Sequence, residues 1–511
     1  MSNITGKVPH KHIIFPCRFE SGSSSRKIHP IVLSAIRSLF ENISLAVVLN
    51  LLIKTAWILT NNVVQDRVGH TEFGMYLALY SFGFLFLALA DMGINQYTTK
   101  TLAAKPELLR KLFPSLLSLK VVLSGIYPFF VLGAGWMAGY RGEELYLLFI
   151  LSFVHGILQL NFFFRANFQA FQKFSLDAFA SVLDRILMLG IVLILLFTRI
   201  DLEGYILAYL ASAGLTLVIL MLFTTKLFGW MRLRLEAASA QELVRLSFPF
   251  ALITILYSVN DKVDQVLLER LIGGDAGKHQ TGLYGGAYRW VDTVMMYLWT
   301  VLPIFFAKFA HHVHDEKALG RLLAFGQPIA AIPMFFAGFF GLIYGEKLLF
   351  QFTHSTAEEL ATMTLCLKIL FVAVIVNGVF AIYSTLLTST NHERFVSWMI
   401  GISILMNVTL NCIFIPRFGA LAAACNTVVS FCFLSVSYVW FIHFRLPIDF
   451  PWKMLARLLG VGALFGLGFW GMSRTAMPWW LVSGLAGLLL LGLAYYAGLL
   501  RMKMDDDAKT A

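Results

Sequence analysis

GMYLALY (Gly74–Tyr80) recurs later in the chain as GLYGGAY (Gly282–Tyr288). Each copy follows a lysine inside an apolar segment, Lys54 before the first and Lys262 before the second. The offset between the copies is 208 residues for the lysines (262 − 54) and also for the tyrosines (284 − 76). A loop signature and a cation that repeat at one offset indicate an internal duplication. In membrane proteins, two matching halves are typical of transporters whose binding site lies between the repeats.

The composition around this repeat is that of a membrane protein. Hydrophobic residues make up 58% of the 511 positions and charged residues 14%, with a mean hydropathy of +0.75. Apolar windows of about 18 to 25 residues, each long enough to span a bilayer, recur along the chain about fourteen times. The alternating segments of about ten residues that mark a β-barrel are not visible. The sequence therefore predicts an all-α polytopic membrane protein with about fourteen transmembrane helices. The predicted spans cover residues 43–66, 73–95, 114–138, 145–165, 175–198, 203–226, 246–269, 281–306, 322–345, 362–388, 395–415, 418–443, 455–473 and 477–500.

The duplication divides these spans into two pseudo-symmetric six-helix lobes followed by two C-terminal helices. An even number of spans separates the first helix from the seventh, so both halves are expected to share one orientation, as parallel repeats do. The predicted divisions are a cytoplasmic tail with an interfacial helix at 1–42, a first lobe at 43–228, a basic cytoplasmic linker at 229–245, a second lobe at 246–443, two additional transmembrane helices at 444–500 and a cytoplasmic tail at 501–511.

The distribution of lysine and arginine predicts the orientation. When the N-terminus is assigned to the cytoplasm, most basic loop residues fall on the cytoplasmic side, in agreement with the positive-inside rule. Both termini are then cytoplasmic. The net charge of +11 is explained by this topology and does not indicate nucleic-acid binding. The first forty residues lack the apolar core and the cleavage site of a signal peptide.

Basic residues inside the predicted spans are the main functional clue. Those about eight to twelve residues from either end of their helix, or about 12 to 18 Å at 1.5 Å per residue, are Lys54, Arg185, Lys262 and Arg289. A cation at this depth costs at least about 2.5 kcal/mol unless it faces water, a partner or a ligand. Four such cations predict a wet, cationic cavity. Lys120 and Lys368 lie nearer to helix ends, so their ammonium groups are expected to reach the membrane interface.

Acidic residues in the same spans leave another interpretation open. Asp261 and Asp264 on the seventh span, Asp292 on the eighth and Asp184 on the fifth could neutralise the cations. Asp261 lies at a depth similar to that of Arg289, so a structural ion pair between them is an alternative to substrate binding, since buried charges are usually paired. The carboxylates could instead titrate during transport or bind a coupling cation.

No motif for a cofactor or for catalysis accompanies these charges. GLYGGAY is rich in glycine but lacks the lysine and the serine or threonine of a phosphate-binding P-loop. No metal or other cofactor is expected. Every predicted loop is short, whereas a membrane enzyme that polymerises sugars commonly carries a sizeable external loop. The sequence therefore predicts a transporter rather than an enzyme.

Five segments, taken together in their order and spacing, are similar to those of one known family. They are DRVGHTEFGMYLAL (Asp66–Leu79), ADMGINQYTTKTLA (Ala90–Ala103), FQAFQKFSLDAFASVLDRI before the fifth span, the stretch from LSFPF to GLYGGAYR, and TNHERF followed by NVTLNCIFIPRFGALAAACNTVVS. They resemble the Wzx-type oligosaccharide flippases of the MOP exporter superfamily, which carry lipid-linked sugar units. The resemblance covers residues 43 to 445.

The resemblance implies a MATE/MOP-like fold whose central cavity is lined mainly by spans one, two, seven and eight. Lys54, Lys262 and Arg289 fall on these spans, and Arg185 is also considered a cavity residue. The implied substrate is a polyprenyl-pyrophosphate oligosaccharide, flipped by alternating access across the bacterial cytoplasmic (inner) membrane during O-antigen, lipopolysaccharide or other surface polysaccharide biosynthesis. The implied partners are this lipid-linked substrate, membrane lipid, a coupling ion (H⁺ or Na⁺) and polysaccharide polymerase machinery.

Two other functions remain open on the sequence. One is a multidrug or toxin cation antiporter of the same superfamily, although such chains usually have about twelve spans and carry cations, which favours acidic cavities. The other is a membrane glycosyltransferase, polymerase or ligase, against which the short loops and the absence of a clustered carboxylate pair argue.

Overall fold

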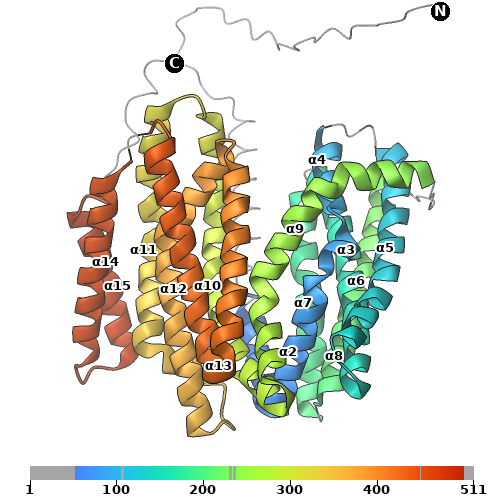
Figure 1. Ribbon diagram of the computed structural model, residues 1–511, viewed down its shortest axis with the longest axis horizontal. Coiled ribbons are helices and arrows are strands. Elements are labelled where there is room, and N and C mark those ends of the chain that lie inside the picture. Colours follow the sequence, from blue (N-terminus) through green and yellow to red (C-terminus); the bar gives the residue numbers. More distant parts are fainter. Residues whose placement is uncertain are drawn as a thin grey trace, which may run out of the picture.

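The computed structural model describes residues 52–499 except 54, 105, 106, 108, 172, 199, 230–232, 234–236 and 449. Every regular element within this part of the chain is a helix, which confirms the all-α prediction. Figure 1 shows two helix bundles side by side, with α10–α15 in one and α3–α8 in the other. The predictions of an N-terminal interfacial helix and of cytoplasmic tails concern residues outside the described range.

The first half contains long apolar helices joined by short turns. Its helices cover residues 55–68, α2 (His70–Leu85), α3 (Leu87–Asp91), α4 (Ile94–Ala104), α5 (Leu109–Met137), α6 (Gly142–Ala170), α7 (Phe174–Phe197) and α8 (Leu202–Phe228). Helix α8 begins at a typical acidic N-cap, because the Asp201 carboxylate accepts a 2.9 Å hydrogen bond from the Gly204 backbone N–H.

The second half continues the same architecture. Its helices are α9 (Ala237–Ile272), α10 (Gly274–His311), α11 (Glu316–Leu348), α12 (Ala357–Ser389), α13 (Glu393–Arg445), α14 (Trp452–Ser473) and α15 (Trp479–Tyr496). Helix α9 begins at Ala237, inside the segment predicted as a linker, and descends between the two bundles in Figure 1. The last two helices pack on α11, where the Phe336 and Phe469 rings stack with centroids 6.4 Å apart.

The predicted spans from 114–138 onward each fall on a single helix, whereas the span 73–95 is divided over α2, α3 and α4. Fewer helices qualify as spans by length and composition. In the described chain ten helices qualify, or eleven when the bent α2–α4 segment is counted as one. Helix α13 accounts for part of the difference because its 53 residues contain two predicted spans. Its backbone is non-helical at Gly419 (φ 56°, ψ −136°), so it consists of two helices that meet at a kink, one for each of the predicted spans 395–415 and 418–443.

The second span is broken. Helix α3 ends at Asp91, and the chain passes through two residues with positive φ, Met92 (47°) and Gly93 (73°), before α4 begins. A non-glycine residue in this conformation is uncommon and requires support from its surroundings. A broken membrane helix frees backbone groups that need partners, so such breaks are tolerated where they line a cavity or are buried in protein.

Buried apolar side chains form separate clusters in the two halves. Two clusters draw on residues 64–266 and two on residues 268–499. Helix α9 contributes to both halves, with Leu243 and Val266 in first-half clusters and Leu268 in a second-half cluster. Large apolar side chains such as Phe197 and Trp398 are exposed on the outer surface, as expected for helices that face lipid.

Candidate functional site

The two copies of the repeat meet where α2 crosses α10. A Cβ atom on Gly74 would lie 1.8 Å from the carbonyl oxygen of Lys278, and one on Gly282 would lie 2.1 Å from the carbonyl oxygen of His70. His70 and Lys278 are themselves separated by the repeat offset of 208 residues (278 − 70). The contact is therefore reciprocal, and glycine is required at both positions because only its missing side chain allows the backbones to approach this closely.

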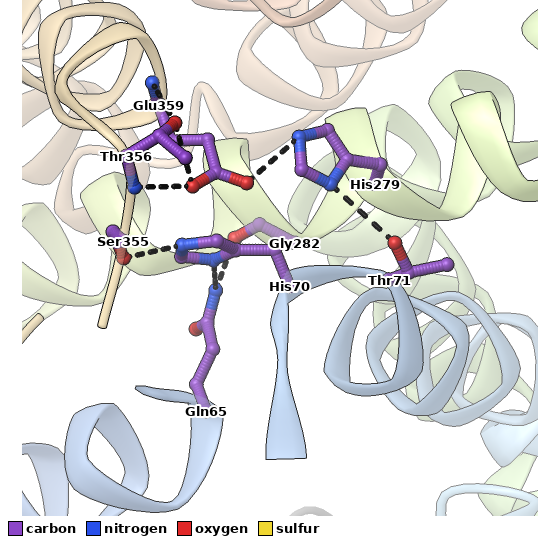
Figure 2. Close-up of polar contacts among 8 residues, drawn as sticks. All are labelled: Gln65, His70, Thr71, His279, Gly282, Ser355, Thr356 and Glu359. Atoms are coloured by element: carbon purple, nitrogen blue, oxygen red, sulfur yellow. Dashed lines mark hydrogen bonds and ion pairs between the residues drawn. The ribbon is translucent and has the colours of Figure 1, made fainter. Parts of the chain in front are cut away.

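A chain of hydrogen bonds surrounds this crossing (Figure 2). The Gln65 amide donates to the Gly282 carbonyl oxygen and to Nδ1 of His70, both at 2.8 Å. Because Nδ1 accepts this bond, a neutral His70 ring carries its proton on Nε2, which donates to the Ser355 hydroxyl at 2.7 Å. The chain joins the first half to α10 and to the loop between α11 and α12.

The neighbouring contacts in Figure 2 extend this connection to α12. Nδ1 of His279 lies 3.4 Å from the Thr71 hydroxyl, and its Nε2 lies 3.4 Å from the Glu359 carboxylate. Glu359 is held in a capping box at the start of α12, since it also accepts a 2.7 Å hydrogen bond from the Thr356 backbone N–H.

Charged contacts complete the same end of the protein. The Asp66 carboxylate accepts 2.9 Å hydrogen bonds from the Thr353 hydroxyl and the His354 backbone N–H, and lies 2.7 Å from Nδ1 of His354. Glu144 at the start of α6 pairs with Lys278 at 2.8 Å. We call the contacts of residues 62–73 and Glu144 with residues 278–289 and 351–359 the closed end, because here polar groups of both halves are bonded directly to each other.

Arg289 connects the closed end to the predicted cationic cavity. Its guanidinium donates to Oε1 of Gln65 and lies 4.9 Å from the centre of the Phe73 ring. Its Nε and Nη1 atoms are buried and have no hydrogen-bond partner among the described residues. The alternative of an ion pair with Asp261 is not what the structure contains, because Arg289 is bonded to a neutral amide.

Lys262 is paired differently. Its ammonium lies 3.1 Å from Oδ2 of the adjacent Asp261 and about 6 Å from the centres of the Phe84 (5.9 Å) and Tyr288 (6.0 Å) rings. Asp292 on α10 is close enough to interact electrostatically with both charges. One ammonium group and two carboxyl groups thus lie close together on α9 and α10.

Asp264 is held by neutral donors. Its carboxylate accepts hydrogen bonds from the Asn411 amide at 2.7 Å, the Thr427 hydroxyl at 2.9 Å and the Tyr284 hydroxyl at 3.3 Å. These donors come from α13 and α10, so Asp264 ties α9 to the rest of the second half. It shares a helix with Asp261 but not its surroundings.

The remaining predicted cations are Lys54 and Arg185. Lys54 lies outside the described residues. Arg185 and Asp184, on α7, line a cavity of about 280 Å³ in the first half together with the aromatic rings of Trp57, Tyr80 and Tyr209.

A model of the polysaccharide biosynthesis protein family matches residues 39–307, more than half of the 511-residue chain. The chain belongs to the polysaccharide biosynthesis protein family. This membership confirms the resemblance to Wzx-type carriers of the MOP superfamily. It also makes the chain a multi-pass membrane transporter rather than an enzyme.

Solved structures of transporters share the fold of this polysaccharide biosynthesis protein. The lipid II flippase MurJ, in an inward closed conformation, is similar over 89% of this chain and 98% of its own, with a TM-score of 0.70 and 14% identity. A multidrug resistance MATE family transporter, in an inward-facing conformation, is similar over 76% of this chain and 93% of its own, with a TM-score of 0.62 and 15% identity. These similarities confirm the MATE/MOP-like fold. No curated protein sequence matches the chain.

The sequence analysis of this polysaccharide biosynthesis protein missed one buried ion pair. Lys120 was expected to reach the interface, but its side chain is fully buried, and its ammonium lies 2.6 Å from Asp91 and 3.2 Å from Oε1 of Gln159. The prediction for Lys120 was therefore wrong. The signal that could have suggested the pair is that Asp91 and Lys120 are opposite charges within neighbouring apolar segments.

Proposed function

We propose that this protein flips oligosaccharides linked to polyprenyl pyrophosphate across the bacterial cytoplasmic membrane, for O-antigen, lipopolysaccharide or another surface polysaccharide. Membership of the polysaccharide biosynthesis family supports this proposal. So does the similarity in fold to a transporter whose name describes it as a lipid II flippase. The lipid tail stays in the bilayer while the head group crosses between the halves.

Arg289 is the observation that carries the proposal. Leaving buried donors unpaired costs about 1 to 3 kcal/mol each, and more for charged groups. Two nitrogens of this guanidinium are buried without partners in the described chain. A guanidinium binds phosphate oxygens with two parallel hydrogen bonds from one of its edges, and either edge combines an unpaired nitrogen of Arg289 with Nη2, the atom bonded to Gln65. A pyrophosphate is therefore a ligand of the right charge and shape.

The bond between Arg289 and Gln65 suggests how binding opens the closed end. Gln65 is the amide that also holds Gly282 and His70. When a pyrophosphate oxygen binds the guanidinium, the hydrogen bond from Arg289 to Gln65 breaks. Gln65 is then held less firmly, which weakens the hydrogen bonds that link it through His70 to Ser355. A ligand shifts a conformational equilibrium only by its differential affinity for the two states. In this mechanism Arg289 supplies that difference.

The predicted orientation gives the mechanism a direction. With both termini in the cytoplasm, the turn between the first helix and α2 faces the outside, and so does the closed end. The structure then corresponds to a state that receives substrate from the cytoplasm. Separation of the closed end would release the head group outside, where polysaccharide polymerase machinery would receive it.

The other predicted residues have supporting roles in this proposal. Lys54 and Lys262 attract the pyrophosphate or acidic sugars, and Arg185 does so within the first half. Asp261 and Asp292 surround Lys262, and they are the carboxylates that we propose for binding a coupling proton or sodium ion. Asp264 holds α9 against α13 during the movement.

The test is transport by the purified protein in proteoliposomes. The probe is the polyprenyl-pyrophosphate glycolipid extracted from the host cells, and its appearance on the opposite leaflet is measured with a membrane-impermeant lectin or oxidant. We expect flipping with the wild type, none without protein, and a large loss with Arg289→Gln. The matched control is Arg474→Gln, because Arg474 is exposed at the end of α14. Absence of flipping by the wild type would refute the proposed substrate.

A complementation experiment tests the lysines. We expect Lys54→Ala combined with Lys262→Ala to abolish surface polysaccharide in a flippase-deficient strain without lowering the amount of protein. Normal polysaccharide in the double variant would exclude the lysines from the cavity role.

A cation antiporter is the second candidate, and the carboxylates of α9 and α10 favour it. Asp261 and Asp292 lie on α9 and α10, which contain the seventh and eighth predicted spans and are expected to line the central cavity. A MATE family transporter also shares the fold. This function predicts that overexpression raises resistance to cationic drugs, and that Asp292→Asn removes the resistance. Unchanged drug sensitivity on overexpression would exclude it.

A further inference from the structure

Two adjoining cavities in the first half are lined by uncharged polar residues that have no role in the proposed binding of the pyrophosphate. One, of about 580 Å³, lies at the break between α3 and α4 and is lined by Asp91, Asn95 and Thr99 together with residues of α6. The other, of about 280 Å³, is the one that contains Arg185. Gln159 and Phe162 line both cavities, so the two are neighbours along α6. We call them the first-half cavities.

The orientation of the amides in the larger cavity follows from Lys120. An ammonium group can only donate, so its contact with Gln159 fixes the oxygen of that amide, Oε1, toward Lys120. The Asn95 amide nitrogen donates to the same oxygen at 3.1 Å. Oδ1 of Asn95 is therefore the free end of the side chain, and it is buried without a partner among the described residues. A residue that lines the larger cavity thus carries an unpaired hydrogen-bond acceptor.

A residue that lines the smaller cavity carries a second unpaired hydrogen-bond acceptor. The Tyr127 hydroxyl donates its proton to the Gly83 carbonyl oxygen at 2.6 Å. Nδ1 of His155 lies 3.4 Å from this hydroxyl, which has no further proton to give, so Nδ1 is the donor in that contact. Nε2 of a neutral His155 is then an acceptor, and it has no partner in the described chain. His155 is only 1% exposed and lines the smaller cavity.

Aromatic rings form the wall around these acceptors. Tyr80 and Tyr209 stack with centroids 6.4 Å apart and an angle of 16° between their planes. Tyr80 also lies 4.5 Å from the His155 ring, and Trp57 lies 6.2 Å from Tyr209. Flat rings beside a few placed polar atoms are typical of sites that orient a small polar ligand.

We propose that the first-half cavities bind the sugar portion of the substrate. Both unpaired atoms are acceptors, and sugar hydroxyl and acetamido N–H groups are donors that match them. The C–H faces of sugar rings pack against aromatic rings. Phosphate oxygens cannot fill this role, because they accept hydrogen bonds and do not donate them. Binding of sugar here rests on the proposed function and divides recognition between Arg289, for the pyrophosphate, and the first half, for the sugar.

The test compares two ligands on the purified full-length protein. One is the polyprenyl-pyrophosphate glycolipid extracted from the host cells, and the other is polyprenyl pyrophosphate without sugar. We expect the wild type to bind the glycolipid about 10- to 100-fold more tightly than the lipid without sugar. Two hydrogen bonds are added, and each contributes up to about a factor of ten in affinity. Asn95→Leu and His155→Phe are expected to lose most of this preference and to keep the affinity for polyprenyl pyrophosphate.

A matched control comes from the same helix as His155. Asn161 is buried, its amide nitrogen donates to the Ala213 carbonyl oxygen, and it lines neither cavity. Asn161→Leu is expected to keep the preference for the glycolipid. Thermal unfolding of each variant in detergent shows that the protein is folded.

The outcomes separate this inference from the proposed function. If Asn95→Leu and His155→Phe keep the full preference for the glycolipid, the sugar site is wrong while the flippase proposal stands. If the wild type binds neither lipid, the flippase proposal fails. If a cationic dye such as ethidium competes with the glycolipid in the wild type and loses affinity in His155→Phe, the cavities bind cations and the sugar site is overturned.

Discussion

The two copies of the repeat, α2 and α10, share their packing and differ in their charges. The matching positions that hold the same residue in both copies are Gly74 and Gly282, Tyr76 and Tyr284, and Tyr80 and Tyr288. Arg289 and Asp292 of α10, in contrast, correspond to Ser81 and Phe84 of α2. The comparison teaches that the contact between the halves depends on what the copies have in common, whereas the charged site depends on what one copy alone contains.

The helices that precede the two copies also differ in charge, and again the second half contains the additional charged residues. Asp261 and Asp264 of α9 correspond to Ile53 and Ala56 in the first half. The first half has its own charges, but Asp91 and Lys120 are buried against each other. Its cavities contain neutral acceptors and aromatic rings, and the cation Arg185 in the smaller cavity lies next to the carboxylate Asp184. An anionic head group is thus best matched by the second half, and an uncharged sugar by the first.

The largest expected effect comes from the shared glycines. Gly74→Ala and Gly282→Ala should each abolish transport, because the new Cβ atom would overlap a backbone carbonyl of the facing helix. In a variant without the five native cysteines, Asn62→Cys should then react with a membrane-impermeant maleimide, since Asn62 is buried at the closed end. Gly214→Ala, which meets no atom within 4 Å, is the control. Different outcomes for the two glycines would contradict the symmetry of the contact.

The next largest effect is expected on stability, at the buried ion pair of Lys120 and Asp91 in the first half. Lys120→Met should lower the free energy of unfolding by about 3 to 5 kcal/mol, because it leaves the Asp91 carboxylate buried without its partner. Adding Asp91→Leu should recover most of the loss. Denaturation in detergent measures both. Lys226→Met, at an exposed position of α8, should change stability by less than about 0.5 kcal/mol. A stability of Lys120→Met equal to that of the wild type would show that the pair is not formed.

A smaller effect distinguishes Arg289 from Ser81, its counterpart on α2. Arg289→Gln should raise the dissociation constant for polyprenyl pyrophosphate about 10- to 100-fold, the equivalent of one charged hydrogen bond. Ser81→Ala should change it less than about threefold, because a removed hydroxyl does not alter the charge. Equal effects of the two substitutions, measured by equilibrium binding, would remove the asymmetry between the copies.

The smallest effect is expected at the rim of the closed end. The His354 side chain is largely exposed and lies 2.7 Å from Asp66, and contacts made by exposed side chains contribute about 0 to 1 kcal/mol. His354→Ala should therefore raise the labelling rate of the Asn62→Cys reporter less than about fivefold. An increase as large as that of Gly282→Ala would show that the rim, and not the glycine crossing, keeps the halves together.

Most of the fold could be predicted because long apolar segments determine where membrane helices form. The break after Asp91 could not, since Met92 adopts a positive φ that its sequence disfavours and only the surrounding helices support. The kink of α13 at Gly419, in contrast, lies within two residues of the boundary between the predicted spans 395–415 and 418–443, so the hydropathy pattern located it.

The site was predicted only in part. Depth alone identified Arg289 and Lys262, because charge within an apolar segment is visible in the sequence. Which charged residues pair with each other was harder to predict from the sequence. Lys120 meets Asp91 only because α5 and α3 are aligned at a particular register, which no single segment specifies. Gln65 and His70 look like solvated turn residues, and their role in joining the halves depends on side chains more than 200 positions away.

The reciprocal contact of Gly74 and Gly282 has a consequence for the ancestry of the protein. At this crossing each half contacts the other through equivalent positions, as the subunits of an isologous dimer do. A chain of half this length, with one copy of the repeat, would carry a surface complementary to itself and would pair with a second copy around a two-fold axis. The glycine crossing is thus the contact expected if two subunits of a symmetric dimer had been joined into one polypeptide.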